Sequence, residues 1–127
     1  MPSFSSEDLQ TLATTFEVDI EPARKDGTLG RRKIIWIVVD GDQAYIRSVR
    51  GAQGAWYRAG KTSGAANLHA GSTSWAVTLT LVTDPAELTR VSDALRQKYE
   101  KRWKQSTAAM LRDEVVPATF RLTPTSS

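Results

Sequence analysis

The chain has 127 residues, a formal net charge of +3 at pH 7, one histidine and no cysteine. The absence of cysteine excludes disulfides, thiolate zinc sites, iron–sulfur clusters and a cysteine nucleophile. The length favours one domain that spans residues 1–127. The longest uniformly apolar run, residues 34–39, is far too short to cross a membrane, and residues 1–12 lack a signal-peptide pattern. We therefore expect a cytoplasmic protein with no membrane partner.

The first part of the chain predicts one short helix and three strands. Ser5 and the two acids that follow it are typical of a helix start. Residues 16–21 alternate apolar and acidic side chains, which predicts a half-buried strand. Residues 33–39 are apolar on both faces and rich in β-branched side chains, so they predict one strand that is covered on both sides. Asp40-Gly41 predicts a tight turn into a strand at residues 43–50.

The second part predicts a helical pair flanked by strands. Asp84 as a cap with Pro85 after it begins a helix of some five turns, and Leu88, Val91 and Leu95 form its apolar stripe. The other expected elements are a short helix at 55–61, strands at 67–71, 75–82 and 115–122, and a helical segment at 106–113. Five or six short, mostly antiparallel strands with helices between them predict an α+β domain or a small barrel.

One face of the strand at 33–39 carries Ile35, Ile37 and Val39, opposite an equally apolar face. A contiguous apolar strand face usually marks an interface. We therefore predict that a second copy of the chain covers this face, which makes the protein a homodimer.

An acid-free segment, residues 43–83, holds four of the cations and no carboxylate. Arg47, Arg50, Arg58 and Lys61 lie in it, together with the aromatic pair Trp56–Tyr57. Unpaired cations beside aromatic rings suit a site for a phosphorylated or otherwise anionic ring compound. The net positive charge also permits a nucleic-acid surface, but the basic side chains at 90–104 fit a solvated helix face better, so we expect no nucleic-acid partner.

The familiar catalytic motifs are absent from the sequence. No serine lies in a G-x-S-x-G motif, and there is neither a Walker loop nor a Rossmann glycine pattern. His69, the one histidine, is expected to be a surface or hydrogen-bonded side chain, and we predict no metal site. The chemistry in the acid-free segment would be binding: Arg side chains hold a phosphate, Ser48 and Thr62 add hydroxyls, and Trp56 either walls a ring or anchors the short helix in the core.

The run IRSVRGAQGAWYRA, from Ile46 to Ala59, resembles a motif of a family of small uncharacterised bacterial proteins. That family is assigned to the FMN-binding split-barrel, or pyridoxamine-phosphate-oxidase-like, fold. The similarity extends from about Phe16 to Leu122, and the Trp–Tyr pair also resembles deazaflavin-dependent reductases of the same fold.

The resemblance implies a six-stranded antiparallel split β-barrel with flanking helices, a homodimer, and FMN or a deazaflavin coenzyme at the subunit interface. Carried over to this chain, the cofactor-binding residues are Arg47, Ser48, Arg50, Trp56, Tyr57, Arg58 and Lys61. We expect Arg47 and Arg58 to be surface cations, so that their replacement by Lys leaves the stability of the ligand-free protein unchanged.

Two functional hypotheses follow. In the first, the protein binds FMN or a deazaflavin and is an oxidoreductase that transfers hydride through the cofactor, for which no protein acid–base pair is needed. In the second, it is a cofactor-free binding or structural protein that keeps the barrel alone. The colour of the purified protein distinguishes the two.

Overall fold

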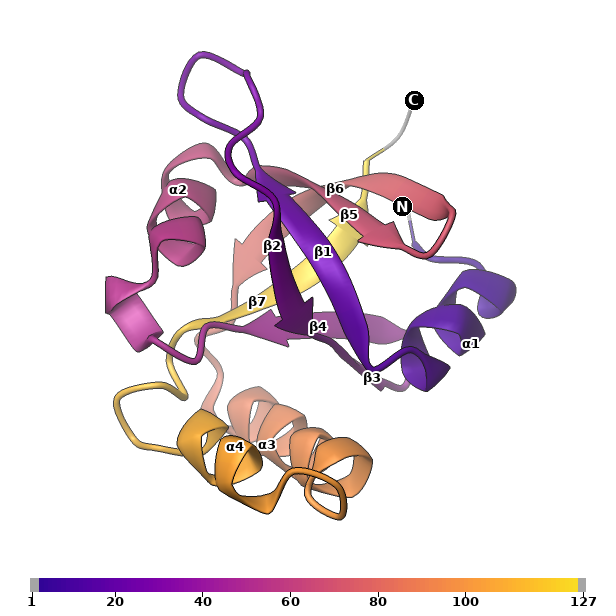
Figure 1. Cartoon of the computed structure of the whole chain (residues 1–127), viewed down its shortest axis with the longest axis vertical. Coiled ribbons are helices and arrows are strands. Elements are labelled where there is room, and N and C mark those ends of the chain that lie inside the picture. The colour runs from indigo at the N-terminus through magenta and orange to yellow at the C-terminus, as the bar shows by residue number, and fades with distance from the viewer. Residues whose placement is uncertain (1–2, 126–127) are drawn as a thin grey trace.

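The computed structural model describes residues 3–125. Its strands form one antiparallel sheet, in the order β2-β1-β5-β6-β7-β4-β3, which curls into a nearly closed barrel (Figure 1). The strands are β1 (Glu17–Pro22), β2 (Lys33–Trp36), β3 (Val38–Asp40), β4 (Gln43–Arg47), β5 (Ala65–Ala70), β6 (Thr73–Leu81) and β7 (Thr119–Pro124). The helices are α1 (Ser6–Thr14), α2 (Ala55–Ser63), α3 (Pro85–Tyr99) and α4 (Lys104–Met110), with a short 3-10 turn, η1 (Gly51–Gln53), before α2. The predicted split-barrel fold is confirmed.

The barrel has seven strands rather than six because the predicted strand at 33–39 is broken at Ile37. β2 pairs with β1 and β3 pairs with β4, so two consecutive strands lie at opposite ends of the sheet order. Ile37 joins them and is fully buried. The Ile37 N–H donates to the Tyr99 hydroxyl at 3.1 Å, and the Ile37 carbonyl accepts from Lys98 Nζ at 2.6 Å. Side chains of α3 therefore replace the strand neighbour that this residue lacks.

Helix α3 closes one end of the barrel. The Asp84 carboxylate caps it by accepting from the Ala86 N–H at 3.1 Å, and Pro85 occupies its first turn. Val91 and Leu95 are buried beneath it and Leu88 packs beside them, so the predicted apolar stripe is confirmed. The helix has 15 residues and ends at Tyr99, so it is somewhat shorter than the predicted five turns. In Figure 1, α3 and α4 lie together at the bottom of the barrel, α1 at its right and α2 at its left.

Lys98 fastens α1 to the same end of the barrel. Its ammonium group donates to three carbonyls, those of Leu12 at 3.0 Å, Thr15 at 2.7 Å and Ile37 at 2.6 Å. Leu12 and Thr15 lie in and just after the last turn of α1, where carbonyls have no partner within the helix. Burial lowers the pKa of Lys98 to about 8. The side chain thus exchanges hydration for three hydrogen bonds that hold a helix end and the barrel corner together.

The predicted reason for dimerisation is wrong. Ile35 and Ile37 are buried in the barrel's own core, and Val39 packs against the same core. The apolar side chain that faces outward from β2 is Ile34, which is 61% exposed. One chain therefore covers the face that we expected a second copy to cover. No helix among residues 3–125 is long and apolar enough to cross a membrane.

The hydrogen bonds at Ile37, the corner between β2 and β3, give a prediction about stability. Tyr99→Phe keeps the ring that stacks on Trp36, with centroids 3.9 Å apart, but removes the hydroxyl. The buried N–H of Ile37 then loses its acceptor, so we expect the free energy of unfolding to fall by about 1–3 kcal/mol, measured by denaturant titration.

The matched control is Tyr57→Phe. The Tyr57 ring is also buried, but its hydroxyl makes no hydrogen bond to any described residue. We expect this variant to unfold within about 0.5 kcal/mol of wild type. Equal losses in the two variants would show that the hydroxyl at the corner contributes nothing specific.

Candidate functional site

The most specific part of the sequence motif builds a tight turn between β4 and α2. The Ser48 hydroxyl donates to the Gly51 carbonyl at 3.0 Å. Gly51 has φ +60°, and a Cβ there would meet the Glu114 carbonyl oxygen at 2.9 Å. A Cβ on Gly54 would lie 2.5 Å from Ser48 Oγ. The serine and both glycines are therefore required by the backbone of this turn, residues 48–54, whatever binds beside it.

A groove of about 450 Å³ lies between this turn, β2, the first half of α2 and the loop at 22–32. Its apolar wall includes Trp56 and Ala59 of α2. Its cations come from separate segments and are Arg24, Arg31, Lys33 and Arg50. No carboxylate lines this groove among residues 3–125. The groove is therefore a basic, partly apolar hollow.

Most of these cations are free to meet a ligand. Arg31, Lys33 and Arg50 are exposed and form no ion pair with any residue that the structure describes. Arg24 is partly engaged, because its Nη1 donates to the Leu29 carbonyl at 2.7 Å. Cations of this kind offer charged hydrogen bonds to phosphate or carboxylate oxygens.

A second hollow of about 260 Å³ adjoins the groove on the side of α4. The two share Lys33, Val49 and Trp56, so they lie side by side in one region of the surface, which we call the depression. Arg47 and Met110 line the far end of the second hollow. We call it the Arg47 hollow below, and the larger one the basic groove.

Arg47 is a buried structural side chain, so the expectation that it is a surface cation is wrong. It is 2% exposed, and its guanidinium has four hydrogen-bond acceptors on β7, α3 and α4. These are Thr119 Oγ1 at 2.7 Å, Ser92 Oγ at 2.9 Å, the Met110 carbonyl at 3.1 Å and the Leu88 carbonyl at 3.2 Å. Burial, and secondarily the charge of Arg96, lowers the pKa of Arg47 to about 10.

The structure brings four of the seven predicted cofactor-binding residues to this depression and leaves three outside it. Ser48, Arg50 and Trp56 line the basic groove, and Arg47 lines the adjoining hollow. Tyr57 points into the core, where its ring lies 5.1 Å from that of Phe120 and burial raises its pKa. Arg58 and Lys61 are exposed on α2 and line neither hollow.

Sequence reasoning missed Arg31 and Lys33 as site residues. Arg31 belongs to the polar loop before β2 and Lys33 begins β2, so both lie outside the acid-free segment in sequence. The run of basic residues at 31–33 was the available signal. That run could not show that these residues lie near Arg50, because only the folded barrel brings the two segments together.

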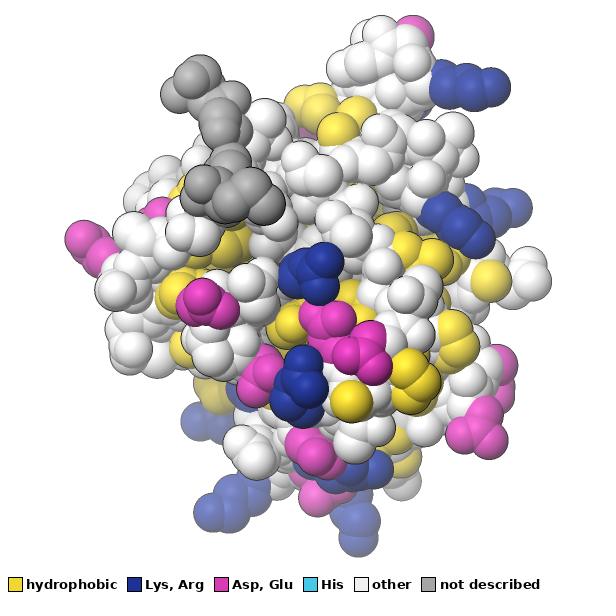
Figure 2. Space-filling model, turned by 180° about the vertical axis from the view of Figure 1, so that it is seen from behind, with side chains coloured by type: hydrophobic (Ala, Val, Ile, Leu, Met, Phe, Trp, Pro, Cys, Tyr) yellow, Lys and Arg dark blue, Asp and Glu magenta, His cyan; other side chains and the backbone are white. Residues whose placement is uncertain are grey.

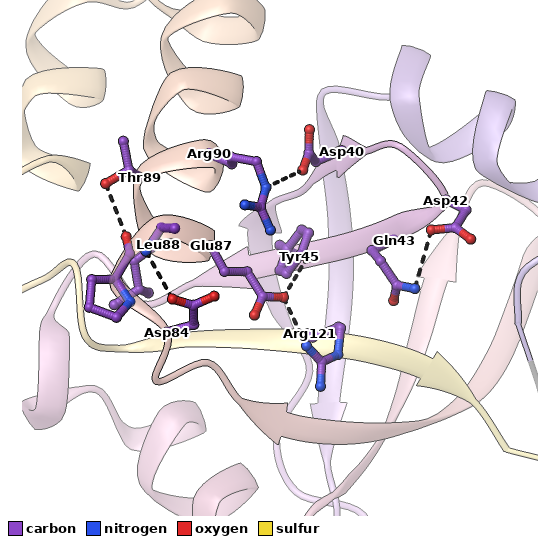
Figure 3. A network of polar contacts seen from close by, with 12 residues as sticks. Asp40, Asp42, Gln43, Tyr45, Asp84, Glu87, Leu88, Thr89, Arg90 and Arg121 are labelled. Atoms are coloured by element: carbon purple, nitrogen blue, oxygen red, sulfur yellow. Dashed lines mark hydrogen bonds and ion pairs between the residues drawn. The ribbon is translucent and has the colours of Figure 1, made fainter.

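The face of the molecule away from the groove carries charges of both signs, and several of them are paired (Figure 2). Basic and acidic side chains lie next to one another there (Figure 2). In the network of Figure 3, Glu87 Oε2 accepts from the Tyr45 hydroxyl at 2.6 Å and from Arg121 Nη1 at 2.8 Å. The hydrogen bond from Tyr45 is the main cause that lowers the pKa of Glu87, whereas burial raises the pKa of Tyr45 to about 12. The bonds of Glu87 thus fasten α3 to β4 and β7 and pair the charge of Arg121.

The one histidine also has a partner. His69 Nε2 contacts Glu21 Oε1 on the outer face of β1 and β5, and His69 lines neither the groove nor the Arg47 hollow. Among residues 3–125 no group of three His, Asp or Glu side chains could hold a metal ion.

Comparison with known proteins gives a family and a fold. A family described as an uncharacterised protein conserved in bacteria, DUF2255, matches residues 8–122. No curated protein sequence matches the chain.

Three solved structures illustrate the likeness in fold. The heme storage protein HutZ from Vibrio cholerae is 9% identical, with a TM-score of 0.65 over 98% of this chain and 92% of that one. A protein assigned as a pyridoxamine 5'-phosphate oxidase from Listeria innocua is 10% identical, with a TM-score of 0.61 over 94% and 90% of the two chains. An F420 reductase is 15% identical, with a TM-score of 0.56 over 92% of each chain. At these identities the likeness establishes the split-barrel fold alone.

The bonds of Arg47 predict that it is needed for stability. Arg47→Lys keeps the charge but cannot reproduce the planar fork that reaches β7, α3 and α4. Loss of two or more of its hydrogen bonds should lower the free energy of unfolding of the ligand-free protein by about 1–3 kcal/mol, measured by denaturant titration. Arg58→Lys, the exposed control in the same motif, should unfold like wild type, and an equal loss there would contradict the assignment.

Proposed function

This chain belongs to the DUF2255 family of proteins conserved in bacteria and has the split-barrel fold, and we propose that it binds FMN or a deazaflavin in the basic groove. The phosphate would meet Arg31, Lys33 and Arg50. The planar ring system would extend along Trp56 and Val49 toward the Arg47 hollow.

The observation that carries this proposal is the set of unpaired cations on a groove without a carboxylate. Elsewhere on the molecule, arginines such as Arg90 and Arg121 have carboxylate partners. A hydrogen bond to a charged group contributes roughly 1.5–3 kcal/mol. Two or three of them on a phosphate total about 3–9 kcal/mol, which spans affinities from millimolar to about micromolar, and the contact of the ring with the apolar wall adds to this.

The walls of the depression suit a flat ring. Trp56 is half-buried and lines both hollows, and its ring also touches the core, with its centroid 6.1 Å from that of Phe120. An aromatic side chain fixed in this way offers a rigid surface for a planar ligand. The two readings of Trp56 from the sequence, core anchor and ring wall, are therefore compatible.

The side chains present favour a flavin over a heme, although one protein of the same fold stores heme. Heme iron is held by His, Cys, Met or Tyr. The described residues of the basic groove include none of these; Met110 of the adjoining hollow is largely buried, and His69 lies on the outer face of the sheet. A bound flavin or deazaflavin would supply hydride-transfer chemistry, which makes an oxidoreductase the activity to test. The chain's own side chains would bind and orient the ring and its phosphate.

We further infer that a second copy of the chain covers the rim of this depression. Ile34 and Val49 are 61% and 48% exposed, and both line the Arg47 hollow. Asp19, the partner of Ile34 in the register, is already paired with Arg32. In a two-fold pair, Ile34 and Val49 of each copy can pack against the same two residues of the other, so the apolar rim is self-complementary.

The dimer gives one prediction. Wild type should sediment at twice the chain mass at micromolar concentration, and Ile34→Glu should sediment as a monomer, because a carboxylate in the buried apolar contact has no partner. Leu29→Glu, an exposed apolar residue that lines neither hollow, is the control and should stay dimeric. A monomeric wild type would overturn the inference.

The cofactor site gives another prediction. Arg50→Gln removes one free cation of the groove, so the Kd for FMN should rise by about tenfold or more, measured by fluorescence quenching. Its matched control is Arg58→Gln, an exposed cation of the same motif outside the groove, which should bind FMN like wild type. The same pair should be titrated with the deazaflavin.

Riboflavin separates the phosphate from the ring. It lacks the phosphate, so it should bind wild type more weakly than FMN and should not distinguish Arg50→Gln from wild type. Equal FMN affinity in all three proteins would place the phosphate elsewhere. Binding of neither cofactor would support the alternative of a cofactor-free barrel.

A further inference from the structure

Arg47 is a buried cation without a counter-ion. Its four protein partners are two hydroxyls and two backbone carbonyls, and it forms no ion pair with any residue from 3 to 125. A guanidinium has five N–H groups, so one N–H on Nη2 has no protein acceptor among the described residues. The neutral partners position the group but do not balance its charge. A buried charge in this state favours any anion that can reach it.

The Arg47 hollow is the space from which an anion can approach this guanidinium. Its walls are mostly apolar and aromatic: Ile34, Ile35, Trp36, Val49, Trp56 and Met110. Its remaining charged side chains, Lys33 and Glu17, have opposite signs, so Arg47 leaves the hollow with a net positive charge. The Ser106 side chain of α4 also lines it and can donate a hydroxyl.

The size and lining of the hollow select the ligand class. At about 260 Å³ it suits a small molecule and is too small for a whole flavin. Apolar walls favour a flat hydrocarbon body, and a charge–charge contact is strongest where such walls exclude water. A carboxylate matches this site better than a hydroxyl or amide does, because one oxygen can accept a charged hydrogen bond from the free N–H on Nη2 and the other can accept from the Ser106 hydroxyl.

We propose that the Arg47 hollow is a binding site for a small organic anion, a carboxylate on a flat apolar body. The carboxylate points to Arg47 and Ser106, and the body lies between Trp36, Trp56 and Met110. The basic groove shares Lys33, Val49 and Trp56 with this hollow, so the bound anion lies beside the site proposed for the flavin ring. If the proposed function holds, the hollow is the substrate pocket. Binding of the anion itself does not depend on the proposed function.

The test uses two probes of equal size and a variant that should fold. Benzoate carries a carboxylate on a flat ring, and benzyl alcohol is its neutral counterpart. Ser106→Asp adds a carboxylate at an exposed position on the wall of the hollow, where it competes with the anion for Arg47. Gln105→Asp adds the same charge to the same turn of α4 but outside the hollow, and is the matched control. Arg47 itself is left intact, because it holds the helices on the barrel.

The binding is followed by ligand-observed NMR titration without flavin. Wild type should bind benzoate at least about tenfold more tightly than benzyl alcohol, the effect of one charged contact. Ser106→Asp should weaken benzoate by a similar factor and weaken benzyl alcohol much less, and Gln105→Asp should match wild type for both. No benzoate binding, equal affinity for the two probes, or equal effects of the two variants would overturn the proposal.

FMN titration of the same proteins separates this inference from the proposed function. If benzoate behaves as expected and FMN does not bind, the anion site stands and its role as a substrate pocket is lost. If FMN binds through Arg50 and benzoate fails, the flavin site stands and the anion site is overturned.

Discussion

The hydrogen bonds at the backbone of Ile37 are the constraint on which the rest of the structure depends. The chain passes directly from β2 at one edge of the sheet to β3 at the other edge. Ile37, the residue between these strands, is buried and has no strand partner for its backbone. Tyr99 and Lys98 satisfy that residue, so α3 has to lie across this end of the barrel. Once α3 is fixed, α4 follows it, and Met110 and Ser106 come to the Arg47 hollow. A structural requirement at one corner thus shapes the candidate site.

Two cations, the half-buried Lys98 and the buried Arg47, hold helices on the barrel in different ways. Lys98 has three N–H groups and three carbonyl acceptors, so its hydrogen bonds are complete and it is purely structural. Arg47 has five N–H groups and four acceptors, all of them neutral. The same side chain therefore holds two helices on the barrel and keeps an unbalanced positive charge beside a hollow. Arg47 thus has a structural role and a proposed role in ligand binding, and both depend on the shape of the guanidinium. Replacement by Lys, which keeps only the charge, is therefore not conservative.

The distribution of paired and unpaired charges separates the two sides of the molecule. On the side of Figure 3, Glu87 joins Tyr45 to Arg121, and Arg90 meets Asp40 at 3.2 Å. On the groove side, cations from two segments converge with no carboxylate among them. Net charge alone could not reveal this asymmetry. It is the physical basis for assigning an anionic ligand to the groove.

The sequence by itself determined the class of the fold and the position of nearly every element, because alternation, caps and turn glycines are local signals. It also singled out the segment that forms one wall of the site. Only the tertiary structure broke the strand at Ile37, since its polar partners lie some 61 residues away on α3 and no local residue marks the break. Burial of Arg47 and the approach of Arg31 and Lys33 to Arg50 were decided in the same way. Each of these features depends on which distant segment packs against the residue, and the periodicity of the sequence does not show which segment that is.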